Sequence, residues 1–381
     1  MKIPRLASIA RVGFVAAFTL GLAVAFWACS NEETALTPSD SPLAELSARA
    51  PEFAQAIGVH NRAIPEILAD SKVAGTAVGA DEHGKPVIMI YTKESVPPGH
   101  LKQDYEGFRV VQHVTGPIKP MKGKPGGGGS GTAKQTPPVK MGTSGGWRYD
   151  LANGYCCGGT LGSLVQIGGT KFVLSNYHVL YSDIVNGGNS RTAQPGDPVI
   201  QPGLIDVSCN ANNAQNVATL VNGGGTLPDP GNPDAVDAGV AQVTSGMVDE
   251  TGAILNVGTI SSSTLNASVG LAVKKMGRTT GLTRSTVSAI NGAFSITYGN
   301  ECAGGTSFTQ SYSGQIVIAN SSCRFQNGGD SGSLLLEDVT TNPRAVGLCF
   351  AGSSVCTSGS IAIANPIGDV LNGLGATMVG Q

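Results

Sequence analysis

The second part of the chain, residues 141–381, consists of short apolar runs separated almost everywhere by turn-forming residues. Gly, Asn, Ser or Pro stands in most of the intervals, and the whole chain holds 54 Gly and 21 Pro in 381 residues. Short runs with regular turn signals between them are typical of antiparallel β-barrels and sandwiches. The predicted strands are 160–167, 171–175, 197–201, 216–221, 236–243, 270–276, 286–290, 314–319, 331–337, 345–350 and 360–364.

The composition supports a folded, mainly β protein. Charged residues make up only 13% of the chain, and apolar residues make up 41%. Few charges and many apolar side chains exclude a disordered, charge-rich chain. Abundant Gly without a three-residue period excludes collagen. The net charge of −2 gives no basic surface for a polyanion, so we expect no nucleic-acid partner.

Residues 1–29 have the layout of an export signal. Three basic residues precede an uncharged stretch at 12–28, as in secretory signals. The stretch ends at Cys29 and resembles a lipoprotein signal, in which Cys29 would carry the lipid, although Phe26 and Trp27 depart from the usual pattern. The alternative is a retained anchor, because the stretch is near the lower length limit for spanning a bilayer. We expect a secreted or cell-envelope protein whose membrane contact is confined to a lipid anchor at Cys29.

Composition divides the remaining chain into four segments. Residues 30–47 are small and polar and indicate a tether. Residues 48–122 predict a small α+β unit, with a helix at 48–68 and strands at 73–78, 86–92 and 108–114. Residues 123–140 include a Gly/Ser run and predict a flexible linker. Residues 141–381 form the β-rich domain, whose last predicted element is a short helix at 367–374.

The α+β unit has two interpretations. It is either a pro-region that assists folding or blocks a cleft, or a permanent accessory domain. If it is a pro-region, we expect cleavage between Lys124 and Val139, because proteases cut exposed Gly/Ser segments.

Eight cysteines suit an exported chain whose thiols oxidise. No Cys-x-x-Cys pair is present and a metal site is not expected. The predicted disulfides join Cys302 with Cys323, Cys349 with Cys356, and Cys209 with either Cys156 or Cys157.

Three segments carry side chains that could act together. His178 ends an apolar strand and is the only His beyond residue 140. Asp237 heads a strand of apolar and small residues, where a buried carboxylate needs a partner. Ser331 lies in the segment Asn-Gly-Gly-Asp-Ser-Gly-Ser at 327–333, whose glycines allow a tight turn that exposes Oγ and directs N–H groups at one spot. Taken singly, these are also compatible with a packed His, a turn Asp and an ordinary β-turn.

Together, the order His178, Asp237, Ser331 matches the chain order of chymotrypsin. Here the sequence resembles the trypsin-like serine peptidases of the chymotrypsin fold, and most of all a bacterial secreted branch. The resemblance covers about 141–381 and includes three further segments, Gln-Pro-Gly at 201–203, Gly-Arg-Thr-Thr-Gly at 277–281 and Val-Gly-Leu-Cys-Phe-Ala-Gly-Ser at 346–353. It implies a double antiparallel β-barrel with the short C-terminal helix, preceded here by the α+β unit.

The resemblance also implies a role for each site residue. Ser331 would be the nucleophile, His178 the general base and then acid, and Asp237 the group that orients the imidazole. The N–H groups of Gly329 and Ser331 would form the oxyanion hole.

The substrate-binding residues follow from the same resemblance. Phe350, Ala351 and Gly352 match the edge segment that pairs with substrate backbone. The specificity pocket floor would lie near Phe325, and no acid occurs in 323–329, which disfavours Lys or Arg and leaves a small or apolar side chain. Asp330 is not expected to be switched by a new N-terminal ammonium.

The predicted function is therefore a secreted serine endopeptidase that forms an acyl-enzyme on Ser331 and requires no metal or cofactor. We expect a monomer that acts on polypeptides. The alternatives are a catalytically inactive, surface-attached β-rich binding module and an esterase with the same triad.

Overall fold

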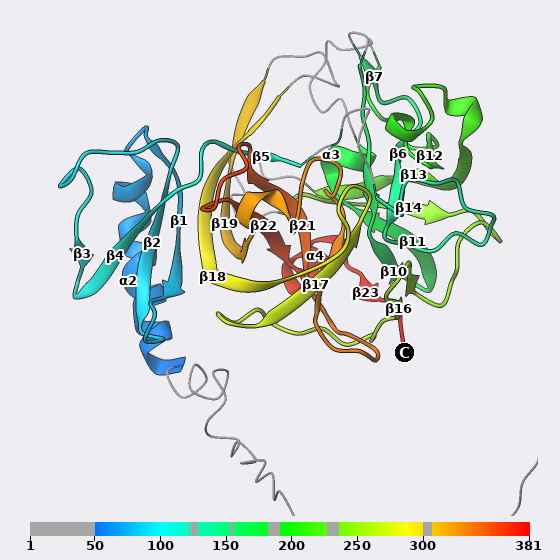
Figure 1. Ribbon diagram of the computed structural model, residues 1–381. Helices are drawn as coiled ribbons and strands as arrows, with labels where there is room; N and C mark the ends of the chain where they lie inside the picture. The colour runs from blue at the N-terminus through cyan, green and yellow to red at the C-terminus, as the bar shows by residue number, and fades with distance from the viewer. Residues whose placement is uncertain are drawn as a thin grey trace, which may run out of the picture.

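The computed structural model describes residues 50–121, 123, 129–152, 155–181, 191–226, 236–299 and 307–381. The predicted export signal, Cys29 and the tether lie outside these ranges. Among the helices described, none has the length and apolar character needed to cross a membrane. The described chain is mainly β, as predicted, and most of it forms two barrels (Figure 1).

The first barrel is one eight-stranded sheet in the order β23-β10-β11-β14-β13-β12-β6-β9. All of its pairings are antiparallel. Strands β9 and β10 are separated only by Gly162 and form one bent strand, so the sheet closes on itself as a barrel. Gly162 is required at this bend, because a Cβ there would lie 2.0 Å from the carbonyl oxygen of Gly332. The strands are β6 (Thr143–Trp147), β9 (Gly159–Leu161), β10 (Ser163–Ile167), β11 (Thr170–Ser175), β12 (Pro198–Gln201), β13 (Gln215–Thr226), β14 (Ala238–Val243) and β23 (Thr377–Met378).

The second barrel runs in the order β17-β20-β21-β22-β19-β18, and a pairing between β17 and β18 closes the ring. These pairings are also antiparallel. The strands are β17 (Ala272–Gly277), β18 (Gly281–Tyr298), β19 (Phe308–Ala319), β20 (Leu334–Glu337), β21 (Ala345–Ser353) and β22 (Ile361–Pro366). The two closed rings confirm the predicted double-barrel fold.

Short elements connect and cover the barrels. The helix α4 (Ile367–Leu374) buries Ile367 and Val370 in the apolar cluster that fills the first barrel. The remaining elements are α3 (Tyr177–Leu180), β7 (Leu151–Ala152), β8 (Tyr155–Cys156), β15 (Ala253–Ile254), β16 (Gly258–Thr259), η2 (Leu204–Asp206), η3 (Ala211–Asn213) and η4 (Ser321–Cys323). Residue Val139, in the predicted linker, is buried and its N–H donates to the carbonyl of Met247.

The N-terminal α+β unit extends the sheet of the second barrel. Its helix α2 (Ala50–Leu68) buries one apolar face on β1 (Val73–Ala80) and β2 (Pro86–Thr92). Beyond these lie β4 (Phe108–Val114) and β3 (Asp104–Tyr105). Strand β1 pairs antiparallel with β18, and this contact places the blue unit of Figure 1 against the yellow strand. The backbones approach closely at Gly75, where a Cβ would meet the ring of Phe294 at 2.0 Å.

The chain leaves this unit through β5 (Ile118–Pro120), which pairs antiparallel with β21. In Figure 1 the segment passes over the second barrel toward α3. The α+β unit and the second barrel are therefore joined through two strands, β1 and β5.

His60 connects the N-terminal unit to β18 from a buried position. Its ring is fully buried, Nε2 lies 3.1 Å from Thr76 Oγ1, and Nδ1 lies 3.1 Å from the Asn291 amide nitrogen. Since the Thr76 hydroxyl donates to the carbonyl of Met89 and the Asn291 amide can only donate, the ring fits as the neutral form with its proton on Nε2. Burial lowers the pKa of His60 to about 4.

We expect the unfolding free energy to fall as the pH drops from 6.5 toward 4. In that window the unfolded chain binds a proton at His60 and the folded chain does not. The unfolding free energy should therefore be about 3 kcal/mol lower at pH 4 than at pH 7. Urea unfolding at both pH values, followed for wild type and His60→Gln, measures it. An equal pH dependence in the two proteins would contradict the assignment to His60.

Candidate active site

His178 and Asp237 are brought together by neighbouring strands of the first barrel. His178 is the second residue of α3, directly after β11, and Asp237 precedes β14. The two strands pair with Ser175 opposite Gly239, so their ends lie side by side. The imidazole Nδ1 lies 2.5 Å from Asp237 Oδ2, and the backbone N–H of His178 donates to Oδ1 at 3.2 Å. Both side chains are buried.

The Asp237 carboxylate has a second partner from the other barrel. The Tyr298 hydroxyl donates to Oδ2 at 2.7 Å and also bonds to the Tyr312 hydroxyl. Burial and the charge of Asp237 raise the pKa of Tyr298 well above its ordinary value, so this phenol remains a proton donor. The amides of Asn176 and Asn365 donate to the backbone carbonyl of Asp237 at 2.7 and 3.2 Å. The carboxylate is thus held in position from both barrels.

Ser331 lies in the loop before β20, at the junction of the two barrels. Its carbonyl accepts a hydrogen bond from the Thr160 N–H at 2.8 Å, and its hydroxyl donates to the carbonyl of Phe350 at 3.0 Å. A Cβ at Gly159 would lie 2.8 Å from the Ser331 carbonyl oxygen and 2.6 Å from Val179, the residue after His178. The serine loop and the His178 helix therefore pack against the same short strand.

Two positive-φ glycines shape the serine loop. Gly329 has φ +101° and Gly332 has φ +92°, values that favour Gly. The N–H groups of Gly329 and Ser331 both donate to one acceptor, the carbonyl oxygen of Met121, at 2.6 and 3.4 Å. Two donors that converge on one carbonyl oxygen beside a serine hydroxyl can stabilise the oxyanion of an acyl-transfer reaction.

Asp330 is held by groups of the same barrel. Oδ1 accepts from the N–H groups of Thr279 and Thr280, and Oδ2 accepts from the N–H of Asn327 at 2.9 Å. The buried Lys275 ammonium lies 3.5 Å from Oδ2. Burial lowers the pKa of Lys275, and the Asp330 charge opposes that shift. Three backbone N–H groups and one ammonium of this barrel thus hold the carboxylate that supports the serine loop.

The predicted substrate-binding residues are all buried. Phe325 packs within the apolar core of the second barrel, beside residues such as Val287 and Ile318. Phe350, Ala351 and Gly352 lie on β21, and Ala351 and Gly352 face Pro120 and Lys119 of β5. The sheet edge expected to receive a peptide is therefore paired with the protein's own chain.

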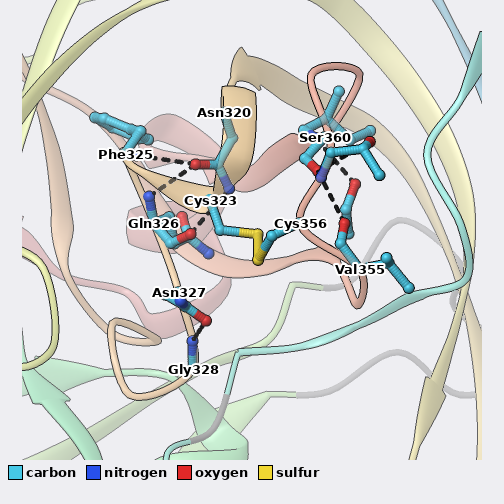
Figure 2. Close-up of a disulfide and its surroundings, with 12 residues drawn as sticks. Asn320, Cys323, Phe325, Gln326, Asn327, Gly328, Val355, Cys356 and Ser360 are labelled. Atoms are coloured by element: carbon cyan, nitrogen blue, oxygen red, sulfur yellow. Dashed lines mark hydrogen bonds between the residues drawn. A yellow bond between two sulfur atoms is a disulfide. The ribbon is translucent and has the colours of Figure 1, made fainter. Parts of the chain in front are cut away.

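One disulfide connects the serine loop to the end of β21. Cys323 bonds to Cys356, and Asn320 holds the intervening turn, because its Oδ1 accepts from the N–H groups of Phe325 and Gln326 (Figure 2). Gln326 in turn donates to the carbonyl of Ala351 at 3.1 Å. The loop before Ser331 is thus attached to the strand that lines the site.

The cysteine pairing corrects two of the predictions. The predicted pairs Cys302–Cys323 and Cys349–Cys356 are wrong, because Cys323 and Cys356 bond to each other. Cys349 is a buried free thiol, and burial raises its pKa to about 12, so it is a poor nucleophile. Cys209 bonds to Cys156, one of its two predicted partners, and Cys157 is also disulfide-bonded.

Sequence reasoning missed Tyr298 and Tyr312. Neither lies in a recognisable motif, and Tyr298 is beyond the predicted strand 286–290. The convergence of Met121 on the serine loop was also not foreseen, since no local pattern indicates it. Within the described ranges, no three His, Cys, Asp or Glu residues form a group that could hold a metal ion.

Comparison with known proteins gives a partial family match and several similar folds. The family model described as the Nal1 C-terminal domain matches residues 214–366, a range that contains Asp237 and Ser331 but not His178. No curated protein sequence matches the chain.

Three solved structures illustrate the fold similarity. Thermobifida fusca protease A is 19% identical over 64% of this chain and 99% of its own, with a TM-score of 0.39. Cellulomonas bogoriensis chymotrypsin is 19% identical over 64% and 99%, with a TM-score of 0.38. A glutamic acid specific serine protease, described as using a histidine triad in substrate binding, is 18% identical over 63% and 100%, with a TM-score of 0.41. At these identities the similarity concerns the fold and assigns no activity to this chain.

Proposed function

We propose that the protein is an exported serine endopeptidase with Ser331 as nucleophile. The observation that carries the proposal is the convergence of the Gly329 and Ser331 N–H groups on one carbonyl oxygen, directly beside the Ser331 hydroxyl. The buried pair of His178 and Asp237 supplies the base that a serine hydroxyl needs.

Each residue has a role in the proposed reaction. The Ser331 hydroxyl turns from the Phe350 carbonyl toward His178, which takes its proton as Oγ attacks the substrate carbonyl carbon. The Gly329 and Ser331 N–H groups stabilise the negative oxygen that forms. Asp237 keeps the Nδ1–H tautomer and stabilises the imidazolium, and Tyr298 holds the carboxylate in place. His178 then protonates the leaving amine, and water releases the acyl group by the reverse sequence.

The substrate class follows from β21. Its edge at Ala351 and Gly352 pairs with an extended strand in the structure, so a polypeptide bound there would add a strand. Export is supported by the two disulfides whose partners are described, because such bonds persist in oxidising compartments. The comparable folds include proteases by description, which agrees with a polypeptide substrate.

The test is covalent labelling by a fluorophosphonate probe together with hydrolysis of a peptide library. We expect wild type to be labelled and to hydrolyse peptides, and Ser331→Ala to do neither. Ser321→Ala, at an exposed serine of the preceding turn, serves as the matched control and should retain both activities. A folded wild-type protein that takes up no label would favour the inactive binding module, and turnover of esters without peptides would favour the esterase.

A further inference from the structure

Residues 118–121 lie in the candidate active site in the manner of a bound peptide. Strand β5 pairs antiparallel with β21, with Lys119 opposite Gly352 and Pro120 opposite Ala351. The N–H of Met121 then donates to the carbonyl of Phe350 at 2.9 Å, which continues the same ladder toward Ser331. The chain therefore reaches the serine as an added, extended strand.

The carbonyl of Met121 occupies the spot where an oxyanion would form. Its oxygen accepts from the Gly329 and Ser331 N–H groups, and Phe350 O accepts from both Met121 N–H and the Ser331 hydroxyl. The electrophilic carbon of Met121 is thereby positioned next to Ser331 Oγ. Interactions of this kind are the ones that align a peptide bond for attack.

The chain is also bound beyond this carbonyl. The N–H of Gly123, two residues later, donates to the carbonyl of Gly158 at 2.9 Å, in an antiparallel bridge on the side of the first barrel. A Cβ on Gly123 would lie 2.7 Å from the Gly329 Cα, so only Gly fits beside the serine loop. The chain is thus hydrogen-bonded at Met121 and again at Gly123, as in a substrate and not as in a released product.

The Met121 side chain indicates which residue the site accepts before the cut. It is 6% exposed, and its methyl carbon would lie 2.7 Å from a Cβ at Gly352. Lys119, two residues earlier on the same strand, is exposed. An uncharged side chain is therefore buried beside Gly352, in line with the absence of an acid from 323–329.

From this geometry we propose that the protein cleaves its own chain between Met121 and Lys122, and that until then residues 118–121 keep Ser331 inaccessible. The proposal rests on the peptidase activity proposed above. It assigns residues 50–121 the role of a pro-region and places the cut before the segment 124–139 that the sequence suggested. The Ser331 side chain is fully buried in the intact chain, as a blocked site requires.

The reaction balances with water as the second reactant. Ser331 Oγ forms a bond to the Met121 carbonyl carbon and gives its proton to His178. The bond from that carbon to the Lys122 nitrogen breaks, and His178 passes the proton to the departing amine. Water then adds its oxygen to the carbon and returns a proton to Ser331 Oγ through His178, leaving a carboxylate at Met121 and a new amino terminus at Lys122.

The decisive experiment compares full-length chains by intact mass and N-terminal sequencing. Wild type should yield a fragment that starts at Lys122, and Ser331→Ala should remain whole at that bond. Met121→Asp places a charge at the buried side chain and should slow the cut by at least a hundredfold. Lys134→Asp introduces the same side chain at an exposed position outside the bound segment and should be cut at the wild-type rate, and Met121→Leu should be cut as well. Thermal unfolding of each variant verifies that it is folded.

Fluorophosphonate labelling separates failure of this inference from failure of the proposed function. In Met121→Asp the charged side chain should leave its buried place, so the uncut protein should be labelled. Wild type that is labelled but stays whole after Met121, or is cut only elsewhere, would overturn the self-cleavage and leave the peptidase standing. Folded wild type and folded Met121→Asp that both take up no label and hydrolyse no peptide would overturn the peptidase and this inference together.

Discussion

Replacement of Asp237 by Asn is expected to lower kcat for peptide hydrolysis by about 10⁴-fold, the size known for the same change in a chymotrypsin-type enzyme. Asp237 accepts the hydrogen bond from His178 Nδ1, and this favours the tautomer with its proton on Nδ1, in which Nε2 carries the lone pair that a base needs. An Asn amide that donates to Nδ1 favours the opposite tautomer, in which the other nitrogen carries the proton. That amide nitrogen takes the place of Oδ2, which Tyr298 also contacts, so the Tyr298 hydroxyl accepts from the amide and donates to the Tyr312 hydroxyl instead.

The measurement is kcat for a small peptide substrate. Because a variant this slow would not cut itself, each change is made and measured in the Met121→Asp background, where Ser331 is expected to be accessible in the uncut chain. Asp249→Asn, a half-buried carboxylate whose partner is Thr251, is the control and should stay within a factor of two of wild type. A kcat for Asp237→Asn within tenfold of wild type would remove Asp237 from the proposed machinery.

Local sequence patterns are sufficient for most of the regular elements. The spacing of Ile367, Val370 and Leu371 predicts the helix 367–374, and α4 has those bounds. The three strands predicted before residue 122 correspond to β1, β2 and β4. These elements are set by the period of their apolar residues, which is visible in any short window.

Longer pairings are not visible in such a window. Strand β18 extends from Gly281 to Tyr298, whereas only 286–290 was predicted. Its register shifts where Asn291 and Gly292 occur, residues that normally mark turns, and one of its edges is covered by β1 from more than 200 positions earlier. The strand continues because a distant segment satisfies its backbone, and this information is absent from the local sequence.

In the candidate site, too, the contacts between distant segments are the part that local sequence patterns do not predict. The pairing of β11 with β14 brings His178 and Asp237 into contact. The disulfide between Cys323 and Cys356 could not be predicted by nearness in sequence, since it joins two loops 33 residues apart that the strands of the second barrel bring together. Tyr298 likewise reaches Asp237 from the far end of a strand in the other barrel.

Replacement of Gly329 by Ala is expected to lower kcat by about 10² to 10³-fold, the loss typical of one missing oxyanion-hole donor. The residue has φ +101°, and a Cβ there would lie 2.3 Å from Thr279 Oγ1, so the backbone has to turn and its N–H leaves the Met121 carbonyl.

Gly314→Ala is the matched control, because Gly314 also has a positive φ but has open space around its Cβ position. Both variants should lose some stability, since Ala is strained at positive φ. Only Gly329→Ala should lose kcat, with KM within about threefold of wild type, because these donors act on the charge that develops during reaction. Equal kcat values for the two variants, measured in the same Met121→Asp background, would mean that the Gly329 N–H does not stabilise the oxyanion.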